Sequence, residues 1–94
     1  MTAPEPRYTL ITTPTVRRQL TDQLPEPVAA AALEFITGPL LDNPHRVGRR
    51  LSPPLHDRHS ARRGTYRVLY RIDDDTRTVA VLAVIHRRNA YRTP

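Results

Sequence analysis

The stretch Gly64-Thr65-Tyr66-Arg67-Val68-Leu69-Tyr70-Arg71-Ile72-Asp73 decides the fold, because it places arginines along a strand rich in aromatic and β-branched residues. Successive side chains of a strand point to opposite faces of its sheet. One face is predicted to belong to the core and carries Tyr66, Val68, Tyr70 and Ile72. The opposite face carries Arg67, Leu69, Arg71 and Asp73.

An apolar strand is predicted after this stretch, and a further strand is predicted before it. Residues 73–77 have the composition of a hairpin turn and lead into a predicted strand over 78–85. Such a turn folds positions 67 and 85 roughly opposite each other. The run 79–85 is apolar without alternation, so we expect this strand to be central and covered on both faces. The preceding strand is predicted over 59–63.

The first half of the chain predicts one strand and two helices. Residues 7–12 have the β-branched and aromatic bias of a short strand. Thr13 followed by Pro14 is typical of a helix start, and apolar residues then recur at helical spacing up to Leu24. A second helix is expected to open at Pro27 and to stop at Gly38.

The overall pattern predicts a small α+β domain. Residues 40–55 show neither helical nor alternating periodicity and are predicted to be a long loop. The order of elements is then β-α-α-β-β-β, with a helical hairpin packed on a small, antiparallel-rich twisted sheet. The length of 94 residues fits one domain over 1–94, in which residues 1–6 form a loose leader.

Composition and charge restrict the partners. The net charge is +6, and all 15 basic side chains are arginine, which favours a polyanionic partner. The chain has no cysteine, and its four histidines are irregularly spaced, so neither a disulfide nor a metal site is expected. No segment reaches the roughly 20 apolar residues of a membrane span, and no signal peptide is recognisable. We therefore expect a cytoplasmic protein without a membrane partner.

Basic and proton-transferring side chains are predicted to meet where the hairpin strands end. RNA cleavage without a metal needs a base for the 2′-hydroxyl, cations for the charge on phosphate, and an acid for the leaving 5′-oxygen. Arg67 and Arg87 can supply the cations, and His86 or Tyr91 can move protons. The aromatic ring of Tyr91 can instead stack on a nucleobase of the RNA. Each of these residues is also compatible with a structural role, and composition alone does not separate RNA binding from RNA cleavage.

Three blocks of sequence resemble the toxins of the RelE/ParE superfamily, the toxic halves of bacterial type II toxin–antitoxin pairs. The resemblance covers most of residues 7–92 and lies in the order of elements and in the segments 46–51, 61–72 and 84–92. It implies a ribosome-dependent mRNA endonuclease, or mRNA interferase, that cuts a message held in the ribosomal A site. The implied products are a 2′,3′-cyclic phosphate and a 5′-hydroxyl, and no metal or other cofactor is implied.

The resemblance also implies roles for individual residues. Arg67 matches the central-strand arginine of the family, Arg87 the basic residue that ends the last strand, and Tyr91 the terminal tyrosine. His86 lies near the place where some members carry a catalytic histidine. Members often have a pair of lysines before the central strand, whereas this chain has arginines, so the general base stays open. The residues expected to bind RNA phosphates are Arg49, Arg50, Arg58, Arg62, Arg63 and Arg88.

Partners and alternatives follow from the same resemblance. The implied partners are the ribosome with its mRNA and an acidic antitoxin with a DNA-binding amino terminus, through which alone the toxin would reach operator DNA. The ParE branch has the same fold and poisons DNA gyrase, and an inactive homologue would act only as an antitoxin-binding co-repressor. Tyr91 and the basic cluster around it favour the RNA-cutting branch.

Overall fold

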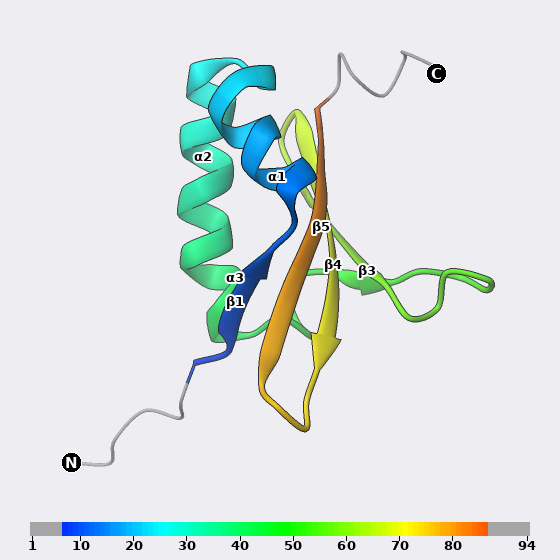
Figure 1. Ribbon diagram of the computed structural model, residues 1–94. Coiled ribbons are helices and arrows are strands. Elements are labelled where there is room, and N and C mark those ends of the chain that lie inside the picture. The colour runs from blue at the N-terminus through cyan, green and yellow to red at the C-terminus, as the bar shows by residue number, and fades with distance from the viewer. Residues whose placement is uncertain (1–6, 87–94) are drawn as a thin grey trace.

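The computed structural model describes residues 7–86, which form a helical layer packed on a twisted sheet (Figure 1). Its strands are β1 (Thr9–Thr12), β2 (Arg49–Arg50), β3 (His59–Arg63), β4 (Tyr66–Asp73) and β5 (Thr78–His86). They form one five-stranded sheet in the order β1-β5-β4-β3-β2. β1 runs parallel to β5, and the other neighbours are antiparallel. The predicted α+β class and the packing of helices on this sheet are confirmed.

The helical layer consists of α1 (Pro14–Arg18), the π-helical turn η1 (Gln19–Gln23), α2 (Glu26–Thr37) and α3 (Pro39–Asp42). Thr13 caps α1 as predicted, and its hydroxyl accepts a hydrogen bond from the Val16 amide at 3.2 Å. The predicted first helix is not uniform, because the Leu24 amide donates to the Gln19 carbonyl at 2.9 Å and widens the last turn. Within residues 7–86, no helix is long and apolar enough to cross a membrane.

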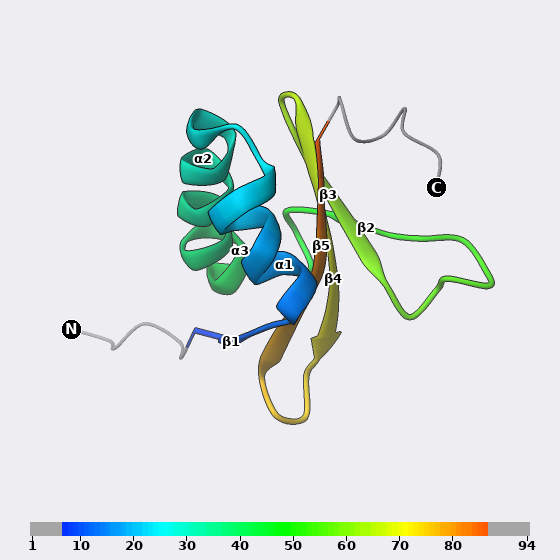
Figure 2. The same cartoon turned by 45° about the horizontal axis from the view of Figure 1, so that its top comes forward.

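The loop predicted over residues 40–55 is wrong in two places. α3 occupies its beginning, where Leu40 and Leu41 are buried, and β2 occupies Arg49–Arg50. One helical turn and a two-residue strand are too short to produce a periodic signal. Residues 43–48 and 51–58 are irregular, and the second of these segments extends from the sheet on the side away from the helices (Figure 2). We call this segment the arm.

β5 lies inside the sheet, as predicted, but the helices cover only one of its faces (Figure 2). The predicted coverage of both faces is wrong. A β-bulge opposite Leu69 and Tyr70 leaves Leu82 unpaired, so the buried positions of β5 are Val79, Val81, Val84 and His86. This shift of one residue explains why buried and exposed positions do not alternate regularly along β5, although the helices cover only one face of the strand.

The hydrophobic core fills the space between the helices and the sheet. Its fully buried side chains include Val16 and Ile36 from the helical layer and Val68 and Tyr70 from β4. The Tyr66 hydroxyl donates to the Ala31 carbonyl of α2 at 3.2 Å, which fixes the side of β4 that faces the helices. The two faces predicted for β4 are therefore confirmed.

Helical side chains complete the edge of β5 beyond the last residue of β1. The Gln19 side-chain oxygen accepts a hydrogen bond from the Val84 amide at 2.8 Å. The Thr13 hydroxyl donates to the Leu82 carbonyl at 3.3 Å. These contacts matter because a buried backbone group without a partner is costly.

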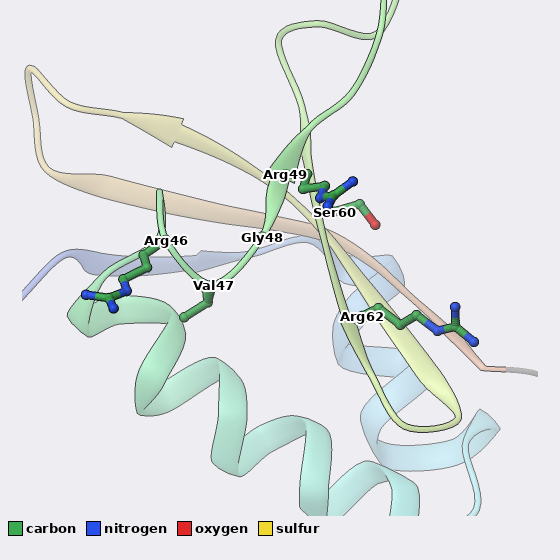
Figure 3. Close-up of a pocket in the computed structure, with 6 residues that line it drawn as sticks. All are labelled: Arg46, Val47, Gly48, Arg49, Ser60 and Arg62. Atoms are coloured by element: carbon green, nitrogen blue, oxygen red, sulfur yellow. The ribbon is translucent and has the colours of Figure 1, made fainter.

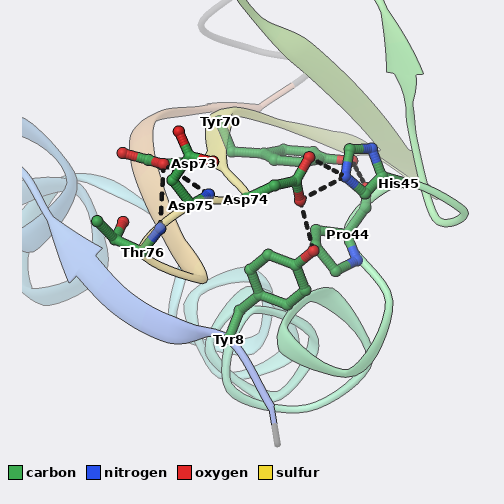
Figure 4. Close-up of polar contacts among 8 residues, drawn as sticks. All are labelled: Tyr8, Pro44, His45, Tyr70, Asp73, Asp74, Asp75 and Thr76. Carbon is green, nitrogen blue, oxygen red and sulfur yellow. Dashed lines mark hydrogen bonds and ion pairs between the residues drawn. The ribbon is translucent and has the colours of Figure 1, made fainter. Parts of the chain in front are cut away.

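A polar cluster fastens the β4–β5 turn to the rest of the domain (Figure 4). The Tyr8 hydroxyl donates to Asp74 Oδ1 at 2.6 Å, and His45 Nε2 lies 2.8 Å from the same oxygen. These contacts, that with Tyr8 first, lower the pKa of Asp74. Asp73 Oδ1 accepts from the amides two and three residues further along, at 3.0 and 3.2 Å. The predicted turn over 73–77 is confirmed.

Candidate nucleic-acid interface

The face of the sheet that the helices leave uncovered is the candidate site, and we call it the open face. The strand register gives its members. They include Arg49 of β2, Ser60 and Arg62 of β3, Arg67, Leu69 and Arg71 of β4, Ala80, Ala83 and Ile85 of β5, and Ile11 of β1. Cationic side chains thus lie over β2, β3 and β4, and apolar ones lie over β5. Such a surface can offer guanidinium groups to phosphates and apolar area to bases.

Two arginines face each other at the centre of the cationic half. Arg62 of β3 is the direct cross-strand partner of Arg67 of β4, and both side chains are exposed. Directly paired residues have Cβ atoms about 4.5–5.5 Å apart, and like charges in such pairs are destabilising. Within residues 7–86, neither guanidinium forms an ion pair with a carboxylate. A bound phosphate would offset their repulsion and accept hydrogen bonds from both.

The predicted pairing of position 67 with position 85 is confirmed, since Arg67 lies opposite Ile85. His86 is the next residue of β5 and lies opposite Tyr66, on the side of the sheet that faces the helices. Its side chain is only 8% exposed. This placement does not fit the expected role of His86 as a base beside Arg67, because neighbouring residues of a strand point to opposite faces.

The expected phosphate-binding arginines separate into two groups. Arg49 and Arg62 lie on the open face. Arg63 lies on the other side, where its guanidinium stacks over the Phe35 ring at 4.5 Å. Arg50 also lies on that side, opposite His59. The structure therefore does not bring Arg50 and Arg63 to the surface that carries Arg67.

Arg58 lies at the end of the arm, immediately before β3. Its backbone is held to the start of the arm, where the Leu51 amide donates to the Arg58 carbonyl at 2.9 Å. Arg87, Arg88 and Tyr91 lie outside the described residues, so their expected roles stay predictions.

A shallow cavity of about 250 Å³ adjoins the cationic half of the open face (Figure 3). Three arginines contribute to its lining, which consists of Arg46, Val47, Gly48, Arg49, Ser60 and Arg62. Arg49, Ser60 and Arg62 project to the same side, whereas Arg46 points away from them (Figure 3). Ser60 adds a hydroxyl group between two arginines, and sequence reasoning missed it because one serine in a strand carries no motif.

Gly48 lets the chain pass close to β3 and β4 at this cavity. A Cβ atom at this position would lie 2.3 Å from the Tyr70 hydroxyl and 2.8 Å from the Ser60 carbonyl oxygen. The Tyr70 hydroxyl donates to the Pro44 carbonyl at 2.6 Å, so it is not free to move. Glycine therefore sets the position of Arg49 beside Ser60.

Burial shifts the pKa values of Tyr70 and His59, behind the sheet, toward their neutral forms. Burial raises the pKa of Tyr70 to about 12. Burial, and then the charges of His45 and Arg50, lower the pKa of His59, whose ring stacks on Tyr70 with centroids 5.5 Å apart. Both residues lie on the helix-facing side. They support the sheet and do not supply a proton-transfer group to the open face.

Comparison with known proteins places this chain in a family. A model of the family described as the ParE toxin of the type II toxin–antitoxin system parDE matches residues 10–91. The chain is 48% identical over 85 residues to the toxin RelE of Mycobacterium tuberculosis, covering 90% of this chain and 87% of RelE. It is 51% identical over 85 residues to the toxin RelG of the same organism, covering 90% of this chain and 97% of RelG.

A solved structure agrees with these relatives. One chain of the toxin–antitoxin complex RelBE2 from Mycobacterium tuberculosis has a TM-score of 0.82 and 51% identity, with coverage of 86% of this chain and 99% of that chain. The protein therefore belongs to the ParE toxin family of type II toxin–antitoxin systems, and its similar relatives include toxins of the RelE type. The resemblance noted in the sequence is confirmed.

Proposed function

We propose that this toxin is an mRNA endonuclease that acts on messages in the ribosomal A site, in the cytoplasm, and that the open face is its RNA-binding surface. The observation that carries the proposal is the exposed pair Arg62 and Arg67. Two like charges at a direct cross-strand position weaken the sheet unless an anion binds there. The similarity to the toxins RelE and RelG supports the same conclusion.

The proposed chemistry is an internal transfer at phosphorus. The 2′-oxygen of a ribose forms a bond to the adjacent phosphorus while the bond from phosphorus to the 5′-oxygen breaks, which leaves a 2′,3′-cyclic phosphate and a 5′-hydroxyl. The 2′-hydroxyl loses its proton to a base, and an acid protonates the 5′-oxygen. Arg62 and Arg67 would stabilise the negative charge that builds on the phosphate oxygens. Arg87 and Tyr91 are proposed to complete the site on the basis of the family resemblance.

An antitoxin is proposed to neutralise the toxin. The solved relative RelBE2 is a toxin–antitoxin complex. For this chain, with its net charge of +6, we propose an acidic antitoxin that covers the basic surface and provides the contact with operator DNA.

Controlled expression without an antitoxin tests the proposal. We expect growth arrest together with cleavage of messages that depends on ribosomes. The double replacement Arg67→Ala and Arg87→Ala should abolish cleavage while the purified protein keeps its circular dichroism spectrum. Unchanged toxicity of a folded double variant would show that another mechanism operates.

Inhibition of DNA gyrase is the second candidate, because the matching family model is described as the ParE toxin. A supercoiling assay with purified gyrase separates the candidates. The nuclease proposal expects no inhibition at protein concentrations that cleave ribosome-bound mRNA. Inhibition without any message cleavage would favour the gyrase candidate.

A further inference from the structure

The open face contains an ion pair that the proposed RNA site does not use. Asp57, in the arm, places Oδ2 3.2 Å from Nη2 of Arg71 on β4. Arg71 lies on the same face as Arg67, two open-face positions further along the strand. The arm thus returns a carboxylate to the cationic half of the open face.

The same carboxylate lies near a second guanidinium. Asp57 Oδ1 is 4.0 Å from Nε of Arg58, which is too long for a hydrogen bond. Arg58 Nε has no hydrogen-bond partner in the part of the chain that the structure describes. The Asp57 carboxylate therefore accepts the donor of Arg71 and lies close to the charge of Arg58. A phosphate oxygen can bind in the same place, because the planar guanidinium group donates hydrogen bonds to carboxylate and phosphate oxygens in the same way.

Exposure makes this ion pair replaceable. The side chains of Asp57 and Arg71 are 50% and 52% exposed, and exposed ion pairs contribute little to stability. A phosphate that brings its own charge can take the place of the carboxylate without unfolding any element. Asp57 belongs to the arm, outside the regular strands, so its side chain can leave Arg71 without a break in the sheet.

Spacing along β4 makes Arg71 a separate position. Residues of a strand rise by about 3.4 Å each, so Arg71 lies about 14 Å from Arg67 along the strand. The two guanidiniums would therefore bind different phosphates of one RNA chain.

We propose that Arg71 is a further phosphate-binding position for single-stranded RNA, and that the Asp57 carboxylate competes with RNA phosphates for it. This inference rests on the proposed function, because it extends the RNA path across the open face. Asp57 then limits the number of phosphates that the protein binds. Removal of its charge adds one phosphate contact, and Arg71 provides that contact.

Binding of a short fluorescent single-stranded RNA to the purified protein, measured at several salt concentrations, tests the inference. Each added phosphate contact steepens the dependence of log K on log salt by about 0.7 for single strands. We expect Asp57→Asn to bind several-fold more tightly than the wild type at low salt and to steepen the slope by this amount. Asp22→Asn removes the same charge from the exposed surface of η1 and should leave the slope unchanged.

The assignment to Arg71 is tested by a double-mutant cycle. Arg71→Gln should cancel the gain of Asp57→Asn and should have a smaller effect when Asp57 is present. The inference is overturned if Asp57→Asn behaves like Asp22→Asn, if the gain survives Arg71→Gln, or if no variant binds the RNA. Cleavage of mRNA on ribosomes by the wild type is measured separately. A failure of the proposed nuclease function is therefore distinguished from a failure of the Arg71 inference, which the salt slopes test.

Discussion

Gly48 is the residue on which the geometry of the cavity depends most directly. An added methyl group would meet the Tyr70 hydroxyl at 2.3 Å, and that hydroxyl is held by the Pro44 carbonyl. We expect Gly48→Ala to lower the free energy of unfolding by about 1–3 kcal/mol, as overpacking does. Urea denaturation measures this change.

A double-mutant cycle with Tyr70 checks the cause. Tyr70→Phe removes the closest atom, so the two replacements together should cost less than the sum of their separate costs. Strict additivity of the two costs would contradict this explanation.

His59 makes stability depend on pH. Its folded pKa lies below the ordinary value of 6.5, mainly because of burial, so the folded state binds fewer protons than the unfolded state. The contribution of His59 is therefore fully favourable above about pH 6.5 and is lost as the pH falls toward the folded pKa. We expect urea midpoints to decline in that window.

Replacement of His59 by phenylalanine isolates this effect. The ring stacks on Tyr70, and its buried Nδ1 has no hydrogen-bond partner among residues 7–86, so an apolar ring fits the site. His59→Phe should reduce the slope of stability against pH below about pH 6.5. A slope equal to that of the wild type would show that His59 is not the titrating group.

At the scale of elements, η1 supports the edge of β5. The Val84 amide, in a fully buried residue, depends on the Gln19 side chain for its hydrogen bond. Gln19→Leu leaves this donor without a partner, which we expect to lower the free energy of unfolding by about 1–3 kcal/mol. Chemical denaturation of Gln19→Leu and of Gln23→Leu, an exposed position in the same turn, makes the comparison. Equal stability of the two variants would contradict the role of Gln19.

Elements with a strong periodic signal could be predicted from the sequence. The alternation in β4 identified its two faces, and the composition of residues 73–77 located the hairpin that pairs Arg67 with Ile85. α3 and β2 could not be predicted, because each is too short to repeat a pattern. The bulge at Leu82 could not be predicted either, because an apolar run that contains a bulge has the same composition as a strand buried on both faces.

The same limit applies to the candidate site. Arg62 and Arg67 could be named from sequence, but their direct pairing depends on the register set by the hairpin at Gly64, whose φ of +58° suits glycine. His86 and Arg63 could not be assigned to a face from the sequence, because the register that decides which of two neighbouring residues shares the face of Arg67 is only roughly predictable. The structure places both on the helix-facing side.

At the scale of the whole molecule, stability and binding depend on different faces of the sheet. The helices bury one face of the sheet (Figure 2). The other face presents Arg62 and Arg67, which have no carboxylate partner within residues 7–86. Replacement of these arginines should therefore change activity far more than stability. An exposed arginine of the helical layer should show neither effect.

Cleavage of mRNA on programmed ribosomes by purified protein tests this claim most directly. Arg62→Gln and Arg67→Gln should each lower the cleavage rate at least about tenfold, because each removes a donor to the charged phosphate. Arg18→Gln, on the exposed surface of α1, is the matched control and should cleave like the wild type. Equal cleavage rates for folded Arg67→Gln and Arg18→Gln would contradict the assignment of the open face as the RNA site.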